Sequence, residues 1–196
     1  MLMSSTAVYE YCDSFDPYHD EFKYVNRYDD EYRVTKRYAE CTLAQDYPHI
    51  PSVVVRYPFV VGMDDYTKRI QFYIEHILYE KPMYIDNLDT PLSFIDSQEA
   101  GEFMAFLANE NIIGIFDGAS FGSITTKQII GIIENLTNKK GGLKPPFCFR
   151  KESPRHFVAL SPLTRGAVHS SNIPTSSQFI QLLVKTHTHN NFVCKG

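Results

Sequence analysis

The stretch Ser4-Ser5-Thr6-Ala7-Val8-Tyr9 decides the fold, together with Tyr32-Arg33-Val34-Thr35-Lys36, which begins 27 residues after Ser5. The first stretch ends a predicted strand with hydroxyl side chains, and the second opens a predicted helix. Tyr32 and Lys36 are four residues apart, so a helix places them on one face. An ammonium near a phenol favours the phenolate and lowers the phenol pKa, which suits a general acid/base. The two stretches therefore predict a site that combines a hydroxyl, a phenol and an ammonium.

The rest of the chain to about residue 140 alternates between strand and helix signals. Val53, Val54 and Val55 form a continuous β-branched run, which is typical of a parallel strand buried on both faces. A predicted helix from Tyr32 to about Gln45 supplies the crossover that parallel strands need. Further strands are predicted at 1–9, 81–85 and 112–116, and further helices at 66–79, 98–109 and 126–136. This alternation indicates an α/β protein.

Local signals suggest where these helices begin and which side chains they bury. Asp64-Asp65, Ser97 and Thr125 are the predicted caps of the three later helices. In the helix at 98–109, the side chains expected to face inward are Phe103, Phe106 and Leu107.

Four pieces in order resemble the extended short-chain dehydrogenases/reductases, the NAD-dependent epimerases and dehydratases. They are the Ser4–Tyr9 strand end, the Tyr32-x-x-x-Lys36 pair, the strand and exit at Pro51–Gly62, and the segment Ser93–Gly101. The resemblance covers residues 1 to about 140. It implies an incomplete Rossmann-type parallel sheet, made of the C-terminal strands and the Tyr-x-x-x-Lys helix, plus a small α/β substrate lobe.

The resemblance also implies roles for individual residues. Tyr32 is expected to be the acid/base for a substrate hydroxyl or carbonyl, while NAD or NADP exchanges a hydride at the same carbon. Lys36 is expected to lower the phenol pKa and, with Tyr32, to bind the cofactor at the nicotinamide ribose. Ser5 is expected to orient the substrate oxygen, with Thr6 as the fallback.

The Gly-rich turn that binds the dinucleotide pyrophosphate in this family has no counterpart here. Neither Gly-x-Gly-x-x-Gly nor Gly-x-x-Gly-x-x-Gly occurs in the 196 residues. We therefore expect a truncated epimerase/dehydratase-like protein that lacks the N-terminal dinucleotide-binding half, binds no cofactor alone and is inactive alone. A complementing N-terminal fragment is the expected partner. The alternative is a non-catalytic remnant, or a module that binds a ligand or partner.

Two departures from the family affect the expected substrate, a small molecule and possibly a nucleotide sugar. Phe59 stands three residues after Arg56, where many members place a substrate-binding Asn. Pro91 and Leu92 stand where a phosphate-binding Arg often lies. A diphosphate would then rely on Lys68 and Arg69 for substrate binding.

The charge and composition of the chain change at Gly141-Gly142. Residues 1–140 hold 12 Lys and Arg against 22 Asp and Glu, whereas residues 141–196 hold 7 against 1. An acidic body argues against a nucleic-acid partner, because phosphate binding needs clustered basic residues. We expect residues 141–196 to be a divergent, poorly ordered basic tail, either a disordered extension or the product of a shifted reading frame.

No signal for a metal or a membrane is present in the sequence. The four Cys are far apart, and the spacing of His156, His169, His187 and His189 matches no zinc motif. No apolar run has the length of a bilayer span, and the N-terminus lacks the features of a signal peptide. A cytoplasmic location is the expectation.

Overall fold

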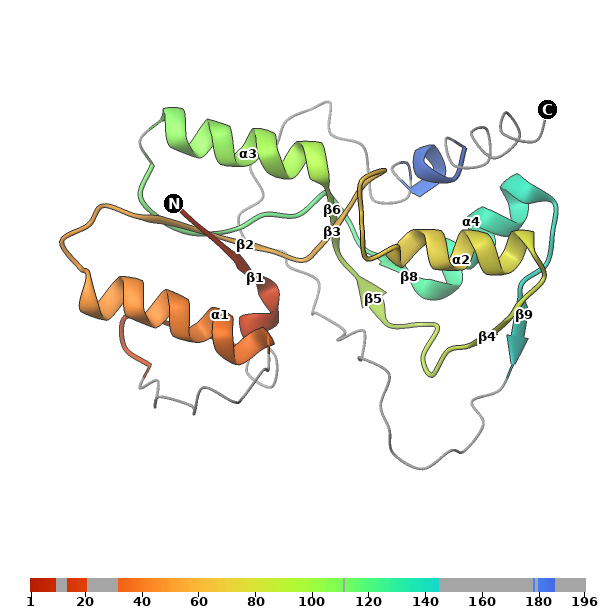
Figure 1. Cartoon of the computed structure of the whole chain (residues 1–196), viewed down its shortest axis with the longest axis horizontal. Helices are drawn as coiled ribbons and strands as arrows, with labels where there is room; N and C mark the ends of the chain where they lie inside the picture. Colours follow the sequence, from red (N-terminus) through yellow and green to blue (C-terminus); the bar gives the residue numbers. More distant parts are fainter. Residues whose placement is uncertain (10–13, 21–31, 111, 145–177, 179, 186–196) are drawn as a thin grey trace.

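The computed structural model describes residues 1–9, 14–20, 32–110, 112–144, 178 and 180–185 (Figure 1). Its first part is a parallel sheet with the strand order β1-β2-β7. The strands are β1 (Leu2–Ser5), β2 (Val53–Tyr57) and β7 (Gly114–Asp117). Ser5 pairs with Tyr57, and Arg56 pairs with Asp117. Because the three strands run in one direction, their carboxyl ends meet at one edge of the sheet.

Helices cover both faces of this sheet. Helix α1 (Tyr32–Cys41) packs on β1, and α3 (Ser97–Asn109) packs on β2. Figure 1 shows the two helices on opposite sides of the strands. All five residues of β2 are buried, which confirms the parallel, doubly covered strand that the Val53–Val55 run predicts. The α/β class and the incomplete Rossmann-type sheet are confirmed as well.

The second part is a smaller lobe built from three strand pairs and two helices. Strands β3 (Phe59–Val61) and β6 (Phe94–Asp96) pair in parallel, as do β4 (Pro82–Tyr84) and β9 (Gly142–Lys144). Strands β5 (Pro91–Leu92) and β8 (Ile124–Thr125) are antiparallel. Helices α2 (Arg69–Leu78) and α4 (Thr126–Thr137) lie against each other and cover these pairs.

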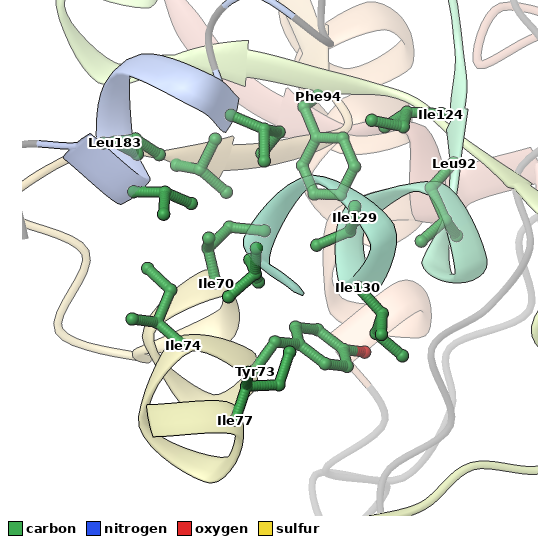
Figure 2. Packing of buried hydrophobic residues seen from close by; sticks show 14 of the residues in the cluster. Ile70, Tyr73, Ile74, Ile77, Leu92, Phe94, Ile124, Ile129, Ile130 and Leu183 are labelled. Carbon is green, nitrogen blue, oxygen red and sulfur yellow. The ribbon is translucent and has the colours of Figure 1, made fainter. Parts of the chain in front are cut away.

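The main hydrophobic core belongs to the lobe and is shown in Figure 2. It combines aliphatic side chains of both helices with side chains of the lobe strands. Its buried members on α2 and α4 are Ile70, Tyr73, Ile74, Ile77, Ile129, Ile130 and Ile133. A second cluster joins β2 to α3, and a third holds Val8, Phe15 and Cys41 under α1.

Two of the connections between the sheet and the lobe are very short. Only Pro58 separates β2 from β3. Proline has no backbone N–H, so Pro58, where the chain leaves the sheet and enters β3, has no amide that needs an acceptor. Strand β6 runs directly into α3.

Several predicted boundaries are confirmed. Helix α1 continues as one π-helical turn, η2 (Thr42–Asp46), so helical backbone ends next to the predicted Tyr47-Pro48 stop. Thr125 caps α4 and forms a capping box with Gln128.

The predicted strand at 1–9 is too long, because β1 ends at Ser5 and Thr6–Tyr9 form a 3-10 turn, η1. The predicted start of the 66–79 helix is also wrong, because α2 begins at Arg69. The cause is Asp65, whose carboxylate accepts hydrogen bonds from the amides of Thr67 and Arg69 and so holds the preceding residues in a turn.

Two predictions for α3 need correction. Its cap is Asp96, which accepts from the amides of Gln98 and Glu99, while the Ser97 hydroxyl donates to Asp64 at 2.8 Å. Phe106 does not face inward and is 44% exposed. The buried face instead holds Ala100 and Leu107, with Phe103 packed beside them.

The predicted basic tail at 141–196 lies mostly outside the described residues. Within the described part, β9 pairs with β4, and residues 178 and 180–185 are helical. Ile180, Leu183 and Val184 are buried in the core of the lobe. The boundary at residue 140 stays a prediction. Across the described residues, no helix has the length and apolar character needed to cross a membrane.

Candidate active site

Two of the predicted catalytic residues, Ser5 and Tyr32, lie at the carboxyl edge of the parallel sheet. Ser5 is the last residue of β1, and Tyr32 is the first residue of α1. Figure 1 shows the start of α1 beside the end of β1. In open α/β sheets, ligands bind outside the carboxyl ends of the strands. The edge that carries Ser5 and Tyr32 is therefore where a substrate would be expected.

Tyr32 and Lys36 share one face of α1, as their spacing predicts. The Lys36 Nζ lies 5.5 Å from the centroid of the Tyr32 ring. The same ammonium donates a hydrogen bond to the backbone oxygen of Met3 at 3.0 Å, so Lys36 ties α1 to β1. The Tyr32 side chain is 60% exposed and accessible to a ligand.

Ser5 and its fallback Thr6 are in different environments. The Ser5 hydroxyl accepts a hydrogen bond from the amide of Ala7 at 3.2 Å. The Thr6 hydroxyl is fully buried and is directed to the backbone oxygen of Tyr57 at 3.4 Å. The Thr6 hydroxyl is thus already used in a contact with β2, which favours Ser5 as the substrate-orienting hydroxyl. Among the described residues, no hydrogen bond joins Ser5 to Tyr32 or Lys36.

The predicted substrate-binding pair lies in the lobe, before and at the start of α2. Lys68 is exposed and has a left-handed backbone, with φ of 55°. Arg69 donates to the hydroxyl of Thr67 and pairs with Asp65 at 3.4 Å. The guanidinium is also 5.5 Å from the ring centroid of Phe59. Lys68 can therefore reach a ligand more readily than Arg69, which has partners of its own.

Sequence analysis missed a buried ionic cluster directly beneath this edge. Arg56 on β2 donates to Glu40 on α1 through Nη2 at 2.6 Å and through Nε at 3.1 Å to each carboxylate oxygen. Ser4 also donates to Glu40. The Arg56 and Glu40 side chains are only 4% and 0% exposed. A signal was available, because an Arg inside a buried apolar strand requires a paired carboxylate.

The cluster continues to the edge of the sheet through Tyr9 and Asp117. Arg56 Nη1 donates to the Tyr9 hydroxyl at 2.6 Å, and this hydroxyl donates to Asp117, with 3.0 Å to each carboxylate oxygen. Burial is the main cause that raises the pKa of Tyr9 to about 12. Burial also raises the pKa of Asp117, against the opposing effects of the Tyr9 hydrogen bond and Arg56.

No family model and no curated protein matches the sequence. Solved structures do match the fold. One is TunA, an NAD-dependent NDP-hexosamine 5,6-dehydratase involved in tunicamycin biosynthesis, with a TM-score of 0.65 and 15% identity. Another is UDP-N-acetylglucosamine 4-epimerase from Methanobrevibacter ruminantium, with a TM-score of 0.60 and 19% identity. A third is UDP-glucose 4-epimerase from Thermus thermophilus in complex with NAD, with a TM-score of 0.56 and 16% identity.

These matches cover most of this chain but only part of the solved chains. The three alignments span 95%, 96% and 94% of this chain, and 62% of each solved chain. The chain therefore has the fold of a portion of the NAD-dependent epimerases and dehydratases. The resemblance inferred from the Ser5, Tyr32 and Lys36 motifs is confirmed at the level of fold.

Proposed function

We propose that the chain is the acid/base and substrate portion of an NAD(P)-dependent epimerase/dehydratase-like enzyme, and that it is inactive alone. The parent reaction is hydride transfer at a substrate carbon that carries a hydroxyl or carbonyl. The observation that carries the proposal is the Tyr32-Lys36 pair on α1 at the carboxyl edge of the sheet, tied to β1 through Lys36.

Each residue has a role that its position allows. Tyr32 takes a proton from a substrate hydroxyl, or returns one to a carbonyl, because its exposed phenol can meet a ligand. Lys36 has three N–H donors and uses one for Met3, so two remain to stabilise a phenolate and to bind a ribose. Ser5 orients the substrate oxygen beside the phenol.

The residues present fit only one end of the cofactor. NAD or NADP, when bound, supplies the hydride acceptor, and Tyr32 and Lys36 would hold its nicotinamide ribose. A pyrophosphate needs a helix N-terminus with free amides. In α2, α3 and α4 a side chain of the chain itself already accepts from a first-turn amide: Asp65 from Arg69, Asp96 from Gln98 and Thr125 from Gln128. This supports the proposal that the chain alone binds no dinucleotide and needs a complementing fragment with a Gly-rich turn.

We also propose a small-molecule substrate, possibly a nucleotide sugar. Nucleotide-diphosphate sugars appear in the names of the three solved neighbours, as substrates of those proteins. Lys68 is the described cation best placed to meet a diphosphate, because its side chain is exposed and Arg69 is engaged with Asp65 and Thr67.

A mixing experiment tests the acid/base assignment. The full chain is combined with the separately expressed dinucleotide-binding half of the Thermus UDP-glucose 4-epimerase, and NADH formation and epimerised product are measured. We expect turnover to appear on mixing, to be lost in Tyr32→Phe with cofactor binding retained, and to be reduced together with cofactor binding in Lys36→Met. Tyr66→Phe, which alters a tyrosine that is 91% exposed, is the control and should keep full turnover. Unchanged turnover in Tyr32→Phe would show that the role of Tyr32 is wrong.

The second candidate function is a non-catalytic remnant or a ligand-binding module. The remnant is favoured by Arg69, because this predicted substrate-binding residue is already paired with Asp65 inside the chain. Calorimetry of the chain alone with NAD, NADP and UDP-glucose separates the two. The catalytic proposal expects no micromolar binding of either dinucleotide. Tight UDP-glucose binding, without turnover on mixing, supports the module.

A further inference from the structure

The turn that follows Ser5 is held at every residue by a different contact. Thr6 is directed to the backbone of β2, and the amide of Ala7 donates to Ser5. The backbone oxygen of Val8 accepts from Nε of Arg37 on α1 at 2.7 Å. The hydroxyl of Tyr9 donates to Asp117 on β7. The η1 turn is thus the junction of β2, α1 and β7, and Ser5 is bonded within it.

The hydrogen bond between Tyr9 and Asp117 is partly buried. The Arg56 guanidinium lies 5.0 Å from the centroid of the Tyr9 ring and also donates to the Tyr9 hydroxyl. The phenol therefore accepts from Arg56 and donates to Asp117, which fixes its proton direction. Asp117 is half-buried at the end of β7.

The charges of the cluster do not cancel when Asp117 is ionised. Arg56 is neutralised by Glu40, with which it shares three short contacts. Asp117 contacts a neutral phenol, so its ionisation changes the net charge of the cluster. The groups that face it are Tyr9 on η1, Arg56 on β2 and, farther away, Glu40 on α1.

We propose that Tyr9 and Asp117 are positioning residues for the Ser5 hydroxyl, and that the charge on Asp117 controls how firmly the η1 turn holds Ser5. The proposal rests on the proposed function of Ser5. An ionised carboxylate accepts the Tyr9 proton in a charge-assisted hydrogen bond, about twice as strong as a neutral one. Protonation of Asp117 weakens this bond, and the change passes along η1 to the Ala7 amide that donates to Ser5.

The experiment follows the backbone amide of Ala7 by NMR in the full chain as pH is varied. We expect the Ala7 resonance to shift with a midpoint above the ordinary Asp pKa of about 3.9, because burial raises the pKa of Asp117. Asp117→Asn should abolish this pH-dependent shift of the Ala7 resonance (the Ala7 step). In Tyr9→Phe, the Asp117 side chain should still titrate, but the resonance of the Ala7 amide should no longer shift with it. Tyr73→Phe, a buried tyrosine in the lobe core, is the matched control and should leave the Ala7 step unchanged.

A purely structural role for Tyr9 would lower stability in Tyr9→Phe and leave the Ala7 step in place, and that result would overturn the proposal. A flat Ala7 titration in the unaltered chain would overturn it as well. If Tyr9→Phe does not fold, a flat Ala7 titration in the unaltered chain, or an Ala7 shift that persists in Asp117→Asn, still overturns the proposal. None of these measurements uses cofactor or turnover. A failure here leaves the role of Tyr32 standing, and a failure of the mixing experiment leaves the Ala7 result standing.

Discussion

Removal of the Glu40 carboxylate should destabilise the chain more than any change to a surface ion pair. In Glu40→Ala, the Arg56 guanidinium stays buried at 4% exposure and loses the carboxylate that contacts it. Its other partners, the Tyr9 hydroxyl and the Phe15 backbone oxygen at 3.3 Å, are neutral and cannot replace the carboxylate. Breaking a buried pair by removing one partner costs about 3–5 kcal/mol. A domain is stable by only about 5–15 kcal/mol, so we expect the loss of about a fifth or more of the free energy of unfolding.

Urea unfolding followed by circular dichroism measures this loss. The matched control is Lys127→Met, which breaks the exposed pair between Lys127 and Asp89 at 3.7 Å and should cost under about 1 kcal/mol. The double variant Glu40→Met with Arg56→Met removes both charges of the buried pair and should recover part of the stability. If Glu40→Ala costs no more than Lys127→Met, the reasoning from burial is wrong.

Three further outcomes are expected. Gly118→Ala should lower the free energy of unfolding by about 1–3 kcal/mol, because the added methyl would lie 2.6 Å from the buried ring of Tyr57. Gly101→Ala, in open space on α3, should be neutral or stabilising by up to about 1 kcal/mol. Equal thermal melts of the two variants would contradict this. Ile180→Ala should cost about 2–5 kcal/mol and weaken hydrogen-exchange protection of α2 and α4, whereas Leu182→Ala, at a 61% exposed site, should do neither. Cys41 is buried, and burial is the main cause that raises its pKa to about 11, so its peptide should resist alkylation at pH 8 until urea is added; rapid labelling of the native chain would refute this.

The sequence predicted those parts of the fold whose causes are local. The Val53–Val55 run indicated a doubly covered strand because adjacent β-branched side chains are typical of a parallel strand buried on both faces. Thr125 and Gln128 have capping-box spacing, and the structure forms that box. The four-residue spacing of Tyr32 and Lys36 was enough to place them on one face of α1.

Other features depend on contacts that no local pattern reveals. Asp96 and Ser97 are both good caps, and the choice between them follows from Asp64, 33 residues earlier, which takes the Ser97 hydroxyl. The Tyr9 contact with Asp117 joins residues 108 apart in sequence. Arg56 could have been recognised as a buried charge, but its partner Glu40 could be identified only from the packing of α1 on the sheet.

The short junctions between the sheet and the lobe determine which motions are available for ligand exchange. Hinge closure requires a few residues whose backbone angles can change by a large amount. Here β2 and β3 are separated only by Pro58, whose φ is fixed by its ring. The passage from β6 to α3 has no intervening residue. The connection at 118–123 between β7 and β8 is longer, so we expect ligand exchange to rely on changes of its backbone angles rather than on a hinge at Pro58 or at the start of α3.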